Sequence, residues 1–126
     1  MKVLSIVESA YRGTIEEQDD TILWLNHIFQ NSGAEITVLL RGNSVNYLLN
    51  NQDASGLNFG DWQQTNPPEL DKDISAMIAK GIPIYAVEED VRDRGLPQDK
   101  FIEGIQLIPL GKVAELCDRA EQVWHW

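Results

Sequence analysis

The chain has 126 residues, 43% of them hydrophobic, which is enough to form one hydrophobic core. Ten Lys and Arg against twenty Asp and Glu give a net charge of -10, so the chain repels the phosphates of nucleic acids and anionic membrane surfaces at long range. We therefore expect one domain over residues 1–126 and neither a nucleic-acid nor a membrane partner.

The cysteine content and the length of the apolar segments predict the cellular compartment of the protein. The single cysteine, Cys117, cannot form an internal disulfide, and no Cys or His cluster has the spacing of metal ligands. The apolar stretch near the N-terminus is too short for a signal peptide or a membrane span. These features predict a cytoplasmic protein without a metal site built from Cys and His.

In the first half of the chain, apolar residues follow strand and helix patterns in turn. Residues 3–7 form a short apolar run, which is typical of a strand buried on both faces. A capping-box pattern at Thr14 predicts a helix that begins there and ends near Asn31. A second strand over residues 36–40 and a short helix over residues 44–49 are expected to follow.

The second half of the chain begins with a long polar segment and then resumes this alternation. From Asn50 to Pro68 the chain is rich in Asn, Gln, Asp, Gly and Pro, so we expect a loop that is either functional or mobile. The patterns that follow predict three helices, over 70–78, 88–94 and 112–121. They also predict two strands, over 82–87 and 105–108. The final segment, 123–126, is able to form an edge strand.

The order of these elements predicts an α/β fold. Strands that alternate with helices are joined by right-handed crossovers, which place helices on both faces of a parallel sheet. We expect a three-layer sandwich with a mostly parallel sheet of about five strands. Ligands of such sheets bind outside the carboxyl ends of the strands. Residues 8–13, 41–46 and 88–92 are therefore the segments in which to look for a site.

Polar and aromatic residues at these strand ends form the first set of candidates. They are Glu8, Tyr11, Arg12, Arg41, Glu88, Glu89 and Asp90. If the first and third strands are neighbours, Glu8 and the acidic run 88–90 share a rim that could bind a metal or a small cation. The alternative is that the acidic run only begins a helix, because carboxylates there complement the helix dipole.

Other chemistry-bearing residues have weaker patterns. Neither GxGxxG nor GxxxxGK[ST] is present, so no nucleotide or other cofactor is expected. Residues 41–43 either hold an anion at a strand end or form an ordinary turn.

His27 and His125 are expected to be surface or packing residues, and Cys117 to be an inert packing residue on the apolar face of the last helix. The tail 124–126, with two Trp, is either a subunit contact or core packing.

Several segments spread along the chain share a pattern with one known family. They are the strand 3–7 with its polar loop and long helix, Glu35 to Leu40 followed by Gly42 and Val45, Lys80 to Tyr85, Arg94-Gly95-Leu96, and the closing run from Val113 to Val123. On these segments the chain resembles the DsrE/DsrF-like proteins, which include the sulfur-relay subunits of tRNA thiolation and of dissimilatory sulfur oxidation. The resemblance covers most of the chain through loose hydrophobic patterns.

The resemblance also implies a function. Persulfide-carrying members have a cysteine eight residues before the glycine of the Arg-Gly pair, and counting back from Gly95 gives Val87. The resemblance therefore places Val87 among the rim candidates, where a valine cannot hold a persulfide. Members without that cysteine are structural partners in assemblies of similar subunits. The chain is thus expected to be a non-catalytic homo-oligomer, a trimer or a hexamer, that works with other sulfur-relay proteins. The alternative is a small-ligand- or metal-binding protein, or an enzyme, that uses the acidic rim.

Overall fold

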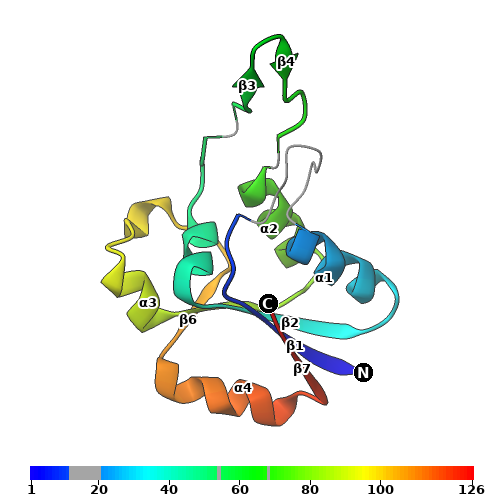
Figure 1. The fold of residues 1–126 in the computed structure, drawn as a ribbon. Helices are drawn as coiled ribbons and strands as arrows, with labels where there is room; N and C mark the ends of the chain where they lie inside the picture. Colours follow the sequence, from blue (N-terminus) through cyan, green and yellow to red (C-terminus); the bar gives the residue numbers. More distant parts are fainter. Residues whose placement is uncertain (12–20, 54, 68) are drawn as a thin grey trace.

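The computed structural model describes residues 1–11, 21–53, 55–67 and 69–126, and its centre is a five-stranded sheet (Figure 1). The strands lie in the order β6-β5-β2-β1-β7, and each neighbouring pair is parallel. Their bounds are β1 Lys2–Val7, β2 Glu35–Leu40, β5 Ile84–Val87, β6 Gln106–Ile108 and β7 Gln122–His125. The predicted α/β fold with a parallel sheet of five strands is confirmed.

Helices cover both faces of the sheet. The α-helices are α1 Thr21–Asn31, α2 Leu70–Ala79, α3 Glu88–Asp93 and α4 Val113–Arg119, and the 3-10 helices are η1 Gly42–Leu48, η2 Gln98–Lys100 and η3 Leu110–Lys112. In Figure 1, α1 and α2 lie on one side of the sheet and α4 lies on the other. This is the predicted three-layer sandwich.

Apolar side chains of the central strands point alternately to the two faces and form two hydrophobic clusters. The larger one lies under α1, α2 and η1 and contains the fully buried Tyr47, Ile74 and Met77. The smaller one, the α4 cluster, consists of Leu4, Ile6, Leu39, Val87 and Leu116. Because β1 and β2 contribute to both clusters, their sequences are nearly continuous apolar runs.

Several boundaries differ from the predictions. The strand expected from residue 82 begins at Ile84, because Pro83 has no N–H to donate and contributes its carbonyl oxygen to Val38 N instead, at 2.9 Å. The helix start expected at Thr14 lies outside the described residues. The segment 123–126 was expected to be able to form an edge strand, and β7 is one, paired only with β1 in the sheet.

The segment from Asn50 to Pro68 is not irregular throughout. It contains a short antiparallel hairpin, β3 Asn58–Phe59 and β4 Trp62–Gln63, that projects from the body of the molecule (Figure 1). Gly60 makes the turn possible, because its φ of +57° is a conformation that other residues rarely adopt. None of the helices in the described ranges has the length and apolar character needed to span a membrane.

Candidate functional site

The carboxyl ends of β1, β2 and β7 meet at one edge of the sheet, where polar side chains at these ends contact one another. Glu8 contacts two basic groups through different oxygens. Its Oε1 lies 2.7 Å from Arg41 Nε, and its Oε2 lies 3.0 Å from His125 Nε2. We call Glu8, Arg41 and His125 the rim network. All three side chains are partly exposed, so solvent screens the ion pair between Glu8 and Arg41.

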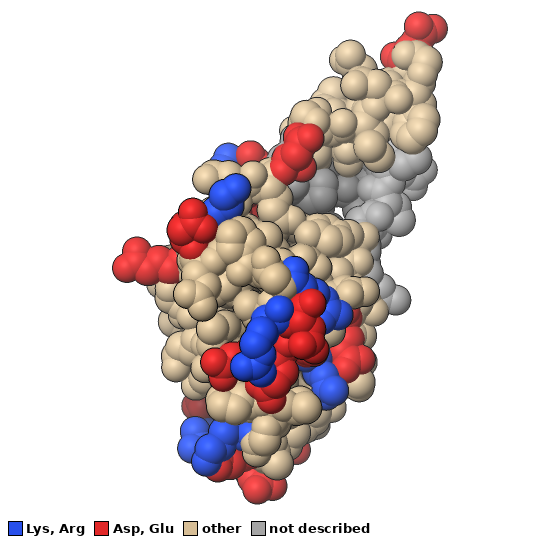
Figure 2. Space-filling view, turned by 90° about the vertical axis from the view of Figure 1, so that its left-hand side faces the viewer, with Lys and Arg blue, Asp and Glu red and all other residues tan. Residues whose placement is uncertain are grey.

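Residues 41–43, a candidate anion site, already contact carboxylates of the protein itself. The N–H of Gly42 donates to Asp90 Oδ2 at 2.8 Å, while Arg41 is paired with Glu8. The side chain of the following residue, Asn43, is also engaged, since its Oδ1 accepts a hydrogen bond from Arg94 Nη2 at 2.9 Å. In Figure 2, positive and negative side chains alternate on the side of the molecule where α3 lies. The rim therefore neutralises itself and leaves no isolated positive charge at this turn.

The local fold that positions Arg41 depends on one buried hydroxyl. Ser44 is fully buried in η1, and its Oγ accepts a hydrogen bond from Arg41 N at 3.0 Å. The same hydroxyl donates to the carbonyl oxygen of Val7 at the end of β1. Ser44 thus ties the ends of β1 and β2 together, which fixes the backbone from which Arg41 reaches Glu8.

Glu8, which follows β1, and the acidic residues that begin α3 do not form one cluster. Glu8 and the acidic run 88–90 were expected to share a rim only if the first and third strands were neighbours, and this condition is not met, because β2 lies between β1 and β5. Glu89 is engaged elsewhere, since its Oε2 accepts the N–H of Leu110 at 2.9 Å. Glu88 lines a separate hollow of about 520 Å³, whose walls also include Arg92 of α3 and Leu107 of β6. Within the described ranges, no three or more His, Cys, Asp or Glu side chains are grouped as metal ligands.

Val87 is not part of the rim surface, so its inclusion among the rim residues needs correction. Its backbone ends β5 as the alternation predicts, but its side chain is 0% exposed and belongs to the α4 cluster. The position falls on the strand face that α4 covers, and burial of an aliphatic group there is favourable. Cys117 packs against the same cluster and is partly buried, in agreement with a packing role. Arg12 lies outside the described residues.

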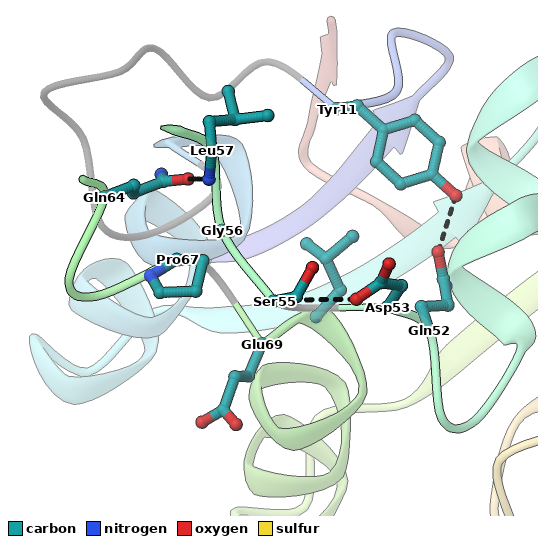
Figure 3. A pocket seen from close by; sticks show the side chains of 10 residues that line it. Tyr11, Gln52, Asp53, Ser55, Gly56, Leu57, Gln64, Pro67 and Glu69 are labelled. Atoms are coloured by element: carbon teal, nitrogen blue, oxygen red, sulfur yellow. Dashed lines mark hydrogen bonds between the residues drawn. The ribbon is translucent and has the colours of Figure 1, made fainter. Parts of the chain in front are cut away.

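A hollow of about 280 Å³ lies beyond the carboxyl ends of β1 and β2 (Figure 3). The segment after β1 and the long segment after η1 form its walls together with the start of α2. Its lining residues are Tyr11, Gln52, Asp53, Ser55, Gly56, Leu57, Gln64, Pro67, Glu69 and Leu70. Of the sequence candidates that lie within the described residues, Tyr11 is the one that lines this hollow.

Tyr11 is held at the hollow by contacts to both its backbone and its side chain. Its φ of +55° is unusual for a residue other than glycine, and its N–H donates to the hydroxyl of the buried Tyr47. Its own hydroxyl donates to Gln52 Oε1 at 2.7 Å, and the two tyrosine rings pack edge to face at 5.3 Å. Burial raises the pKa of the Tyr11 hydroxyl, so this group is a neutral donor at physiological pH.

The acidic residues of the hollow have different environments. Asp53 Oδ1 accepts the N–H of Ser55 at 2.9 Å, and hydrogen bonds from the backbone and the side chain of Ser55 lower the Asp53 pKa, which keeps the carboxylate charged. Glu69 points away from the Tyr11 ring in Figure 3, and its carboxylate contacts Lys72 Nζ at 2.7 Å. The hollow thus combines an aromatic ring, apolar walls and one charged carboxylate.

Sequence reasoning missed most of these contacts. Gln52 and Asp53 lie in the polar segment that was expected to be functional or mobile, so the composition located the region but not the residues. His125 was assigned to the surface or to packing, and it is exposed as expected, but its contact with Glu8 was not predicted. That contact arises because β7 lies parallel to β1 in a register that pairs Ile6 with His125.

Comparisons with known proteins show what this fold is similar to. No protein-family model matches the chain, and no curated protein matches it in sequence. Among solved structures, the ychN protein from E. coli matches with a TM-score of 0.76 over 99% of this chain and 98% of its own, at 17% sequence identity. The chain has a ychN-like fold.

Two further structures share this ychN-like fold. Protein MTH1491 from Methanobacterium thermoautotrophicum, of unknown function, matches with a TM-score of 0.62 at 17% identity over 99% of this chain and 97% of its own. Protein BT1422 from Bacteroides thetaiotaomicron, also of unknown function, matches with a TM-score of 0.67 at 16% identity over 99% of this chain and 94% of its own. At these identities the likeness shows the fold alone.

Proposed function

We propose that this ychN-like chain is a non-catalytic, DsrE-like subunit that self-associates and works beside a sulfur-carrying partner in the cytoplasm. The observation that carries the proposal is the environment of Val87. In persulfide-carrying DsrE/DsrF-like proteins this position holds the reactive cysteine, and here it holds a fully buried aliphatic side chain.

The chemistry of sulfur transfer supports the same proposal. A persulfide carrier needs a thiolate that solvent and a partner can reach, because the thiolate is the nucleophile. Cys117, the single cysteine, packs against the α4 cluster on a helix and not at a strand end. At the rim, the basic Arg41 already pairs with Glu8, so it is not available to stabilise a nearby thiolate. The described part of the chain thus provides the fold but has no cysteine at the strand end where a persulfide carrier holds its nucleophile.

Transfer of labelled sulfur tests this proposal. We expect that incubation with a cysteine desulfurase and labelled cysteine leaves no stable persulfide on the native protein, because the Cys117 thiol is partly buried. Inorganic polysulfide in urea is the positive control, since unfolding exposes Cys117, and Cys117→Ser is the blank. Stoichiometric label on the native protein that disappears in Cys117→Ser would show a catalytic carrier instead.

A second candidate function is the binding of a small molecule in the hollow beside Tyr11. The observation in its favour is the combination of one aromatic ring, apolar walls and the charged Asp53 carboxylate in a space of about 280 Å³. Together with the net charge of -10, this combination favours a small organic cation over an anion. The protons of the Tyr11 hydroxyl and of the Gln52 amide are already donated within the protein, so the oxygens of these two groups remain as acceptors that can orient a cation.

Thermal unfolding with a panel of small amines and matched carboxylic acids tests the second candidate. We expect amines with an apolar body to raise the melting temperature as their concentration rises, and the matched acids to have no effect. Tyr11→Ala should abolish the rise, whereas Tyr85→Ala, at a partly buried tyrosine on β5 outside this hollow, should retain it. Flat curves for every amine would remove this candidate and leave the first proposal standing.

A further inference from the structure

The hairpin formed by β3 and β4 is a projecting arm, which we define as residues 57–64. Within it Asn58 pairs with Gln63, Phe59 pairs with Trp62, and Gln64 N donates to the carbonyl oxygen of Leu57 at 2.8 Å. The arm stands away from the sheet and its helices in Figure 1. A two-stranded hairpin of this length is at best marginally stable in water unless its apolar side chains pack against something.

The arm exposes three large apolar side chains close together. Leu57, Phe59 and Trp62 are 51%, 57% and 41% exposed, and the rings of Phe59 and Trp62 lie 6.1 Å apart. Aromatic side chains clustered on a protruding surface are typical of protein contacts, where they are enriched over the rest of the surface. The arm therefore has the composition of an interface.

The charge of the arm indicates which partner it fits. Two copies of a chain with a net charge of -10 repel each other, so they associate best through surfaces with little charge. Asp61 is the one charged residue in 57–64, and the projecting part of the molecule in Figure 2 is almost entirely uncharged. A different protein partner would gain most from positive charge placed against the acidic surface. The arm offers such a partner a single carboxylate, that of Asp61.

We propose that the arm is the contact through which a second copy of this chain binds, arm against arm, about a twofold axis. The inference rests on the self-association in the proposed function and specifies its surface. In a twofold contact the same patch serves both subunits, so Phe59 of one arm packs on Trp62 of the other and the reverse contact forms as well. Closed trimers have no twofold axis, so this contact selects a dimer or a hexamer over the trimer.

Mass measurements on an arm variant test the inference. Sedimentation equilibrium of the wild-type chain should give an even-numbered assembly, and Phe59→Ser combined with Trp62→Ser should halve its mass. Trp24→Ser on α1 is the matched control, since Trp24 is 50% exposed and lies outside the arm, and it should keep the wild-type mass. Circular dichroism of both variants checks that the five-stranded sheet is retained.

Ionic strength gives an independent readout. Raising it from about 0.01 M to about 0.15 M shortens the screening length from about 30 Å to about 8 Å, which weakens repulsion between the acidic bodies. Association of the wild-type chain should therefore strengthen with added salt. Weaker association at the higher salt concentration would overturn the contact proposed here, because it would point to charge attraction between the copies.

The outcomes separate this inference from the proposed function. A wild-type assembly whose mass is unchanged in the arm variant, or a wild-type trimer, overturns the arm contact but leaves self-association in place. A wild-type monomer at high concentration overturns both. Equal loss of mass in Trp24→Ser also overturns the arm contact, because the effect would then not be specific to the hairpin.

Discussion

Val87→Asp is expected to lower the free energy of unfolding by about 3 kcal/mol or more, because it places an unpaired carboxylate among the aliphatic side chains of the α4 cluster. Val87 is 0% exposed, so the charge gains no solvation unless α4 moves. Urea denaturation at neutral pH measures the loss. The loss should shrink as the pH falls, since a protonated carboxyl group is uncharged.

Val87→Cys is the matched control at the same position. It removes little volume and introduces no charge, so we expect a loss of about 0.5 to 1.5 kcal/mol. In a Cys117→Ser background, the new thiol should react slowly with a thiol reagent until urea is added, because burial in apolar surroundings makes a thiol inert. If Val87→Asp cost less than about 1 kcal/mol, or if the native Val87→Cys thiol reacted at once, position 87 would be open to solvent.

Tyr47→Ala is expected to destabilise the protein by about 3 to 5 kcal/mol, because it leaves a large cavity in the larger hydrophobic cluster. Tyr47 is fully buried in η1 and carries the hydroxyl that accepts the N–H of Tyr11. The substitution therefore removes both core packing and the support for Tyr11 at the hollow. Thermal or urea unfolding followed by circular dichroism measures the effect.

Tyr47→Phe separates these two effects. It keeps the ring and removes the hydroxyl, so its cost should be about 1 kcal/mol. The amide resonance of Tyr11 should nevertheless shift in nuclear magnetic resonance spectra of Tyr47→Phe, since its hydrogen-bond acceptor is gone. An unchanged Tyr11 resonance would contradict the role of Tyr47 in positioning the hollow.

Much of the fold follows from short local patterns. The apolar run at residues 3–7 and the one at 36–40 have residues facing both clusters, so a buried parallel strand is the conformation that satisfies all of them. The hairpin in residues 50–68 was not predicted, because its strands are two residues long and its neighbours are residues that usually break regular structure. Gly60 is the residue that could have indicated a tight turn, because glycine readily adopts the positive φ that hairpin turns require.

The candidate site could be predicted only in part, for a geometric reason. Strand-end residues such as Glu8 and Arg41 were located because the carboxyl ends of parallel strands meet at one edge. Which strands are neighbours is not encoded locally, so the contact of Glu8 with His125 was missed, and the condition for grouping Glu8 with the acidic run 88–90 is not met. The direction of the Val87 side chain depends on which face α4 covers, and periodicity alone does not supply that.

The pairing of β1 with β7 has a consequence for how the chain folds during synthesis. Lys2 and Glu121 are joined by a hydrogen bond although 119 positions separate them, so one edge of β1 stays open until β7 is made. Contacts this distant in sequence form slowly, because a long loop must close before they are gained. During this interval the open edge of β1 can pair with other strands, so the nascent protein should benefit from chaperones more than a fold closed by local contacts.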